Sequence, residues 1–195
     1  MAVEVMKPAV YAEDAQDLAC KVMMERGLNP DDFVIQVGLD DGQNMVKVMM
    51  TIKEKVIISE EKGKKAKYSE GYCPKEFRLS GVKKLIVLFV SPTCERHDNI
   101  STILELLGLG AIDFVCSADL KMLHIICGKQ AASCKHCCPF CDGSSPWLGK
   151  YQSLTIGNLW SNYNSFVAND SNIKTAMKFG NTVNPPLLTV FERQT

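Results

Sequence analysis

Residues 33–52, FVIQVGLDDGQNMVKVMMTI, contain the pattern that decides the fold. The first half is rich in β-branched residues and ends on Asp40, Asp41 and Gly42, which predicts a strand that runs into a tight turn. The second half, Val46–Ile52, predicts another strand, close enough along the chain to pair with the first as a hairpin. This stretch therefore predicts the antiparallel start of a sheet.

The residues that follow add a third strand, a helix and a fourth strand. Lys84–Val90 is an apolar run of the kind that forms a fully buried strand. Asp98 or Asn99 is expected to cap a helix over Ile100–Leu107, and Ala111–Cys116 predicts the fourth strand. Three sequential strands and a helical crossover to a fourth give a mixed sheet, antiparallel first and parallel later. The expected fold class is therefore mixed α/β with flanking helices.

Helical segments flank this sheet along the chain. Apolar residues recur at helical spacing in Ala12–Arg26 and again in Leu120–Cys127. Further helices are expected over Thr155–Val167 and Asn172–Phe179. We therefore divide the chain into an N-terminal helical segment, a core, and a C-terminal segment with a cysteine cluster, at residues 1–30, 31–130 and 131–195.

Composition and charge narrow the class of protein. The chain has 195 residues, of which 46% are hydrophobic, enough for one domain with a real core. Its formal net charge is +0, whereas a compact nucleic-acid-binding protein usually carries a basic excess that neutralises phosphates. The most basic stretch, Lys62–Lys67, is expected in an exposed loop, with contact to a phosphate backbone as the alternative. Strong binding to DNA by this chain alone is not expected.

The cysteines indicate a reducing compartment. There are nine of them, an odd number, and Cys20, Cys116 and Cys127 lie within apolar runs, as reduced core residues do. Residues 1–8 lack the apolar core of a signal peptide. No segment reaches the roughly 18 apolar residues of a membrane span. We therefore expect a nuclear or cytoplasmic protein without a membrane partner.

Acidic residues stand at the ends of two expected strands. Phosphodiester chemistry with two Mg²⁺ or Mn²⁺ ions needs several carboxylates within a few ångströms of one another. Asp40 ends the first strand and Asp119 ends the fourth, so the two carboxylates meet if those strands are neighbours. Each has an ordinary alternative role, Asp40 in a hairpin turn and Asp119 as a helix N-cap.

Two further acids compete for a place in this site. Strand alternation puts Asp40 and Asp41 on opposite faces, and the residue type alone does not choose between them. Glu95 follows the third strand and is able to approach the same edge, although a surface loop is the expected place for it. The candidate catalytic residues are therefore Asp40, Asp119, Asp41 and Glu95, with Asp40 and Asp119 as metal ligands.

The segment Cys134–Cys141 packs five soft metal ligands into eight residues. Cys138 and Cys141 lie three positions apart across a turn that Pro139 stiffens, and this is the usual half of a tetrahedral zinc site. The candidates for the other half are Cys134, His136 and Cys137.

Two other uses of these thiols remain open beside zinc. The sequence Cys-Pro-Phe-Cys also resembles the redox motif of glutaredoxins, which needs its first cysteine at a helix N-terminus. Residues 142–146, DGSSP, do not start a regular helix after Cys141, so the redox interpretation is disfavoured. An inert group of thiols is the other alternative. Structural zinc is the prediction.

The segment Glu95–Cys141 resembles the catalytic core of the large subunit of the V(D)J recombinase and of related invertebrate transposons, including Transib-like elements. Glu95 precedes a short Leu-rich helix with Asn and Thr, Asp119 stands at a strand end, and Cys138 begins a Cys-x-x-Cys nineteen residues later. Upstream, Gly38–Gly42 resembles the strand that bears the family's first catalytic Asp.

The resemblance covers roughly residues 33–190. It implies an RNase H-like nuclease of the DDE transposase type, which cuts DNA by water attack and joins ends by hydroxyl attack. It maps the first two catalytic acids to Asp40 and Asp119, with Mg²⁺ or Mn²⁺ as the catalytic ion and Zn²⁺ as a structural ion in a Cys-rich insertion. DNA is the partner that it implies, and a homodimer is a further expectation.

The chain departs from the family pattern after the cysteines. The family's third acid is a Glu on a later helix and its two zinc-ligating histidines also lie downstream, whereas here no His follows His136 and the later Glu is Glu192. We therefore expect a truncated copy that does not catalyse strand transfer alone. The alternative is a zinc-stabilised binding or scaffold module without nuclease activity.

Overall fold

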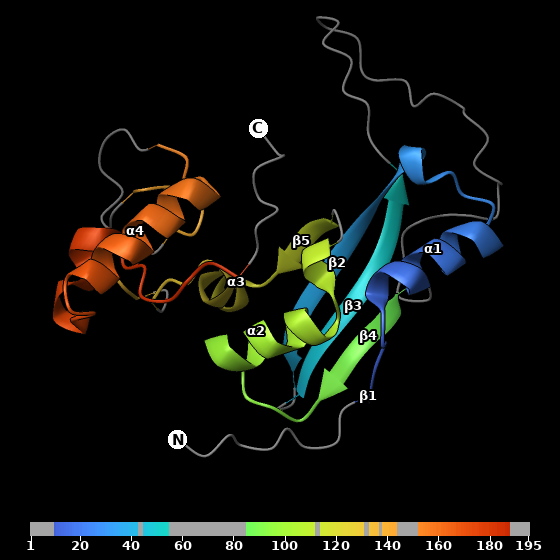
Figure 1. The fold of residues 1–195 in the computed structure, drawn as a ribbon, viewed down its shortest axis with the longest axis horizontal. Coiled ribbons are helices and arrows are strands. Elements are labelled where there is room, and N and C mark those ends of the chain that lie inside the picture. The colour runs from blue at the N-terminus through green and yellow to red at the C-terminus, as the bar shows by residue number, and fades with distance from the viewer. Residues whose placement is uncertain are drawn as a thin grey trace, which may run out of the picture.

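The computed structural model describes residues 10–42, 45–54, 85–111, 114–130, 133–136, 138–143 and 152–187. The expected basic loop Lys62–Lys67 lies outside these residues, as does Cys137. The described part is a mixed α/β fold, with a sheet, helices packed on it and a helical C-terminal part (Figure 1).

The described residues form the following strands and helices. The strands are β1 (Val10–Tyr11), β2 (Phe33–Gly42), β3 (Met45–Glu54), β4 (Ile86–Ser91) and β5 (Phe114–Ala118). The helices are α1 (Ala15–Glu25), α2 (His97–Leu106), α3 (Leu120–Ile126) and α4 (Ile156–Ala168), with 3-10 helices at Pro30–Asp32, Leu109–Ala111 and Ile173–Phe179.

The strands form one mixed sheet in the order β1-β4-β3-β2-β5. The hairpin pairs β2 with β3 in antiparallel fashion, and β4 adds to β3, also antiparallel. The chain then crosses through α2, and β5 pairs with β2 in parallel, with Ala118 beside Leu39. The predicted mixed sheet, antiparallel first and parallel later, is confirmed.

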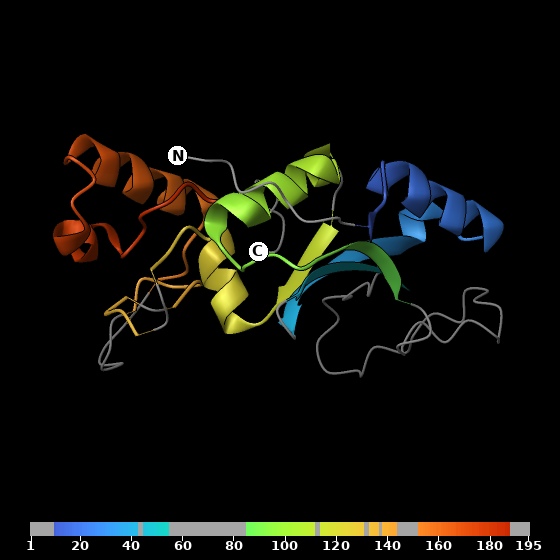
Figure 2. The ribbon, with the colours of Figure 1, turned by 90° about the horizontal axis from the view of Figure 1, so that it is seen from below.

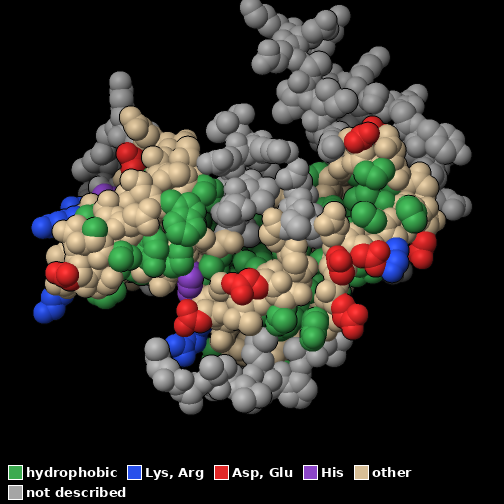
Figure 3. Space-filling view, in the orientation of Figure 1, with side chains coloured by type: hydrophobic (Ala, Val, Ile, Leu, Met, Phe, Trp, Pro, Cys, Tyr) green, Lys and Arg blue, Asp and Glu red, His purple; other side chains and the backbone are tan. Residues whose placement is uncertain are grey.

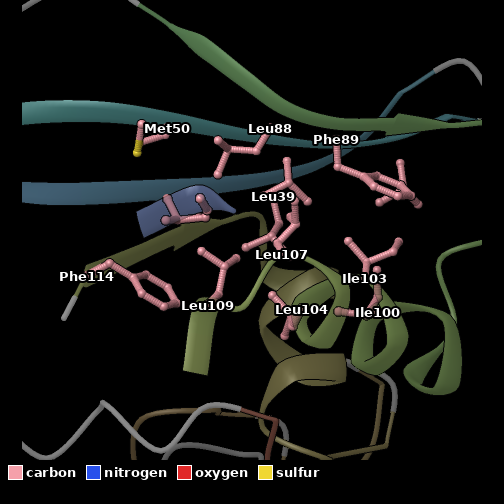
Figure 4. Packing of buried hydrophobic residues seen from close by; sticks show 14 of the residues in the cluster. Leu39, Met50, Leu88, Phe89, Ile100, Ile103, Leu104, Leu107, Leu109 and Phe114 are labelled. Atoms are coloured by element: carbon pink, nitrogen blue, oxygen red, sulfur yellow. The ribbon is translucent and has the colours of Figure 1, made fainter. Parts of the chain in front are cut away.

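One face of the sheet carries the hydrophobic core. Helices α1 and α2 both lie on this face (Figure 2). Side chains of β2 and β3 alternate in burial, so that Val37 and Leu39 point to the core opposite Met50 and Val48. Figure 4 shows Leu39, Leu88 and Phe89 of the strands facing the helical residues Ile100, Ile103, Leu104 and Leu107. Fully burying one side chain of this size stabilises the fold by about 2 kcal/mol.

Several boundaries differ from the sequence prediction. Strand β2 continues to Gly42, because its pairing with β3 extends to the pair Gly42 and Met45. The predicted caps Asp98 and Asn99 lie inside α2 instead, which begins at His97 after Arg96 without a side-chain cap. The expected helix from Asn172 is a 3-10 helix capped by the Asn172 side chain.

The C-terminal part returns to the core at the end of α3. Gly128 adopts a left-handed conformation there, and its carbonyl oxygen accepts hydrogen bonds from the backbone of Val183 and Asn184. Leu187 donates a backbone hydrogen bond to Ile126, and it packs against the core. The ring nitrogen Nε2 of His97 lies 2.8 Å from the carbonyl oxygen of Pro185. Residues 182–187 therefore run along α2 and α3 as a strap.

A search of the described helices for a membrane span finds none that is both long enough and apolar enough.

We predict that Gly128→Ala lowers the free energy of unfolding by about 3 kcal/mol, because the new methyl group meets backbone atoms and the left-handed conformation disfavours a side chain. The added Cβ would lie 2.0 Å from the carbonyl oxygen of Asn184. Urea unfolding followed by circular dichroism measures the change. Gly110→Ala is the control, since no atom lies within 4 Å of its added Cβ. Equal stability of the two variants would contradict the strap.

Candidate functional site

Three carboxylates gather near the ends of β2, β4 and β5. Asp41 lies on the core-facing side of β2, opposite Val46, and its side chain is 22% exposed. Glu95 lies in the loop between β4 and α2, with a side chain only 2% exposed. Asp119 follows β5 directly and begins α3. Because β2 and β5 run in parallel, both carry their acid at the same edge of the sheet.

Asp40 does not join this group. It is paired with Lys47 across the hairpin, on the opposite face of β2 from Leu39 and Asp41, and it is exposed. The alternation of the strand therefore separates the two neighbouring aspartates. We replace Asp40 by Asp41 as the first acid of the candidate site.

Lys121 stands among the three carboxylates. Its ammonium forms an ion pair with Glu95 Oε2 and lies 3.9 Å from Asp41 Oδ2. Its own side chain is 68% exposed, so it reaches the carboxylates from the solvent side. Glu95 first, and then Asp41 and Asp119, raise the pKa of Lys121. The cluster is therefore three negative groups around one positive group.

Burial leaves two carboxylate oxygens without a partner. Asp41 Oδ1 and Glu95 Oε1 are both buried and neither has a hydrogen-bond partner. Burial raises the pKa of Glu95, Lys121 lowers it in part, and the charges of Asp119 and Asp41 raise it further. Burying a charge without full compensation is costly, so these oxygens retain capacity for another donor or cation.

The loop that carries Glu95 is held by Asn99. The Asn99 amide donates hydrogen bonds to Thr93 Oγ1 at 3.0 Å and to the carbonyl oxygen of Cys94 at 2.9 Å. These bonds use the side chain that the sequence predicted as a cap, and they pin the loop above the first turn of α2. Glu95, for which a surface loop was expected, is turned inward instead.

Asp119 has the N-cap role that the sequence left open. Its Oδ1 accepts a hydrogen bond of 2.7 Å from the backbone of Met122. Only one of its two oxygens is used in this bond, and its charge is close enough to raise the pKa values of Glu95 and Lys121. The capping role and membership of the cluster are therefore compatible.

Cys138 and Cys141 lie in the turn that the sequence predicted as half of a zinc site. The backbone of Phe140 donates to Cys138 Sγ at 3.4 Å. Burial and the adjacent Cys138 thiol raise the pKa of Cys141, while a hydrogen bond from the backbone of Gly143 lowers it in part. The net shift of the Cys141 pKa is upward, so the thiol is favoured over the thiolate, which is the form that binds metal.

A buried lysine lies beside the same turn. Lys129 is 5% exposed, and its Nζ donates to the carbonyl oxygen of His136 at 3.2 Å. Burial lowers its pKa, whereas the neighbouring thiols raise it, Cys134 most strongly. Two candidates for the other half of a zinc site therefore lie in this region. Cys134 is close enough to Lys129 to raise its pKa, and the ring nitrogen Nδ1 of His136 lies 3.2 Å from the carbonyl oxygen of Asp142.

Cys116 and Cys127 lie outside the turn and have ordinary roles in the core. Burial raises the pKa of Cys116 to about 12 and that of Cys127 to about 11, which fits the prediction of inert core residues. Cys20 was expected in the core but is exposed on α1, so that prediction is wrong.

The described residues contain no group of three or more His, Cys, Asp or Glu side chains arranged closely enough to hold a metal ion. The carboxylates are of the right chemical type, but an ammonium lies among them. Cys138 and Cys141 lie in one turn, and no described residues complete that turn into a metal site.

The sequence matches no known protein family, and no curated protein matches it closely enough to count as a relative.

Sequence reasoning missed Lys121 and Lys129, and it gave Asn99 the role of a helix cap in place of the one it has. Lys121 lies two residues after a strand-end acid, and this spacing at a helix start was a usable signal. Lys129 lies five residues before Cys134, where the cysteine cluster begins, and carries no such signal, since most lysines are solvated. Asn99 was read as a cap because it stands near the start of a helix in the sequence. Its actual partners, the Thr93 hydroxyl and the Cys94 carbonyl oxygen, belong to a loop whose position the sequence does not reveal.

We predict that Asn99→Ala lowers the free energy of unfolding by about 1 kcal/mol, because two hydrogen bonds, one of them partly buried, are lost while alanine favours the helix slightly. Denaturant unfolding measures this loss. Asn164→Ala, at an exposed position of α4, is the matched control and should leave stability unchanged or slightly raised. A loss of the same size in both variants would mean that Asn99 does not pin the loop.

Proposed function

We propose that the chain is an RNase H-like domain derived from a DDE transposase, whose ancestral reaction is metal-dependent cleavage and joining of DNA strands. One observation carries the proposal: β2 belongs to an antiparallel hairpin and pairs in parallel with β5, and both strands bring an acid to one edge. The Cys-x-x-Cys turn nineteen residues after Asp119 adds support from the family resemblance.

The proposed metal ligands are Asp41, Glu95 and Asp119. Their side chains would have to close around the ion, because as they stand they do not form a group that holds one. Mg²⁺ and Mn²⁺ prefer carboxylate oxygens, and Asp41 Oδ1 and Glu95 Oε1 are buried oxygens without a hydrogen-bond partner. A bound pair of such ions would stabilise the attacking and leaving oxygens of a phosphodiester. Asp41 near the end of β2 and Asp119 after β5 would supply two of the ligands. The loop that Asn99 holds by hydrogen bonds would orient Glu95, the third.

We further propose that this chain alone does not complete strand transfer. The family's third acid is a Glu on a later helix, and the resemblance assigns it no residue among these 195. The formal net charge of +0 supplies little attraction for DNA. On the face drawn in Figure 3, the described Lys and Arg side chains are scattered singly rather than gathered in a patch. DNA contact, in the nucleus or cytoplasm, would need a partner subunit or further chain.

A second candidate function is a zinc-stabilised binding or scaffold module. The Cys138–Cys141 turn favours it, because two thiols with backbone donors form half of a structural zinc site without any need for the carboxylates. Lys121 also favours it, since an ammonium already neutralises part of the acidic cluster. The two functions differ in whether the carboxylates bind a divalent cation.

We predict that the protein binds Mn²⁺ and that Asp41→Asn weakens this binding about tenfold or more, because one anionic ligand is lost. Asp119→Asn should weaken it similarly while keeping an oxygen for the helix cap. Asp40→Asn is the matched control on the opposite face of β2 and should leave the dissociation constant unchanged. Isothermal titration calorimetry measures all four proteins. Equal binding by the wild type and Asp41→Asn would favour the scaffold function.

We also predict that the protein takes up Zn²⁺ and that Cys138→Ser abolishes high-affinity uptake, because the thiolate pair is the metal's preferred donor. Zinc removed by a chelator should lower the melting temperature of the wild type. Cys20→Ser, on exposed α1, should bind zinc as the wild type does. Full zinc uptake by Cys138→Ser would refute the half-site.

A further inference from the structure

The acidic cluster already contains a cation, which is the ammonium of Lys121. We propose that Lys121 is a built-in competitor for the divalent cation of this cluster, so that metal binding requires the lysine side chain to swing out. This inference rests on the proposed function, because it assigns the regulation of the same site.

The position of Lys121 in α3 explains its reach. Asp119 caps the helix and Lys121 is its second residue, so the lysine side chain starts beside the acid at the end of β5. From there it crosses to Glu95 Oε2, with which it forms an ion pair, and comes within 3.9 Å of Asp41 Oδ2. One ammonium therefore engages acids from two other segments, as a metal ion would.

The partner oxygens are used unevenly. Lys121 engages Asp41 Oδ2 and Glu95 Oε2, whereas Asp41 Oδ1 and Glu95 Oε1 are buried without a partner. The Glu95 side chain is only 2% exposed, and one of its two carboxylate oxygens, Oε1, has no hydrogen-bond partner. An ammonium carries one charge among three carboxylates, so the cluster has unused capacity that a divalent cation would fill.

Burial decides which group moves. Asp41 lies in a paired strand and Glu95 lies in a pinned loop, and both side chains are mostly shielded from solvent. Lys121 is 68% exposed, and its ion pairs are made by its head group. Its departure into water carries little desolvation cost, while the carboxylates stay in place. The lysine is therefore the displaceable member of the cluster.

Mn²⁺ titration of the full chain tests this inference. Lys121→Met keeps the length of the side chain without its charge, and it should lower the Mn²⁺ dissociation constant about tenfold or more, because the competitor is gone. Lys121→Gln, which keeps a donor for Glu95, should act in the same direction and covers the case in which the methionine variant does not fold. Lys121→Arg keeps the charge and should bind no more tightly than the wild type.

Lys47→Met is the matched control for a general change of charge. Lys47 belongs to the same hairpin but pairs with Asp40 on the opposite face, so its loss should change Mn²⁺ affinity less than about twofold. Binding by Lys121→Met and Lys121→Gln that is no tighter than in the wild type would overturn the inference, as would an equal gain in Lys47→Met.

The same titration separates the two proposals. If the wild type binds Mn²⁺ through Asp41 and the Lys121 variants gain nothing, the competitor role fails while the proposed function stands. If no variant binds Mn²⁺, both fail.

Discussion

When β5 pairs with β2 in parallel, the chain must cross the sheet through α2 before the fourth long strand is added. This crossing buries α2 against the sheet, and Ile100 and Ile103 reach the core that the hairpin began. It also makes β2 and β5 end at the same edge of the sheet. Asp41 lies near the end of β2, and Asp119 directly follows β5. The acidic cluster therefore exists because of one strand pairing, and it would be absent if β5 ran the other way.

The core-facing side of β2 ends on an acid. Val37 and Leu39 are buried, and Asp41 continues the same face at the edge, where Lys121 and the solvent compensate its charge. A carboxylate at this position is hard to explain by stability, since an apolar residue would extend the core at lower cost. The inward turn of Glu95 adds a second acid beside it, with a side chain only 2% exposed. These two acids are the reason for proposing a divalent-cation site at this edge.

Sequence patterns were sufficient for the hairpin, β4, α2 and β5 and for their order, because the strands are rich in β-branched residues and the crossover helix has a clear apolar face. They missed β1, which pairs with β4, and the prediction that β4 is fully buried is wrong, since Val87 is 55% exposed. They were insufficient where the outcome depends on side-chain orientation. Asp40 and Asp41 are equal in type, and only the register with β3 decides which one faces the core. Glu95 faces inward because of hydrogen bonds from Asn99 to the preceding loop, which no local pattern predicts.

The central claim is that the buried oxygens of Asp41 and Glu95 belong to a divalent-cation site. An anomalous difference map from crystals grown with Mn²⁺ tests it most directly. The account predicts a peak about 2.1–2.2 Å from Asp41 Oδ1 and Glu95 Oε1, with the ammonium of Lys121 displaced into solvent. Crystals with no peak at this edge and Lys121 still paired with Glu95, or with the peak beside Asp40 on the other face, would contradict it.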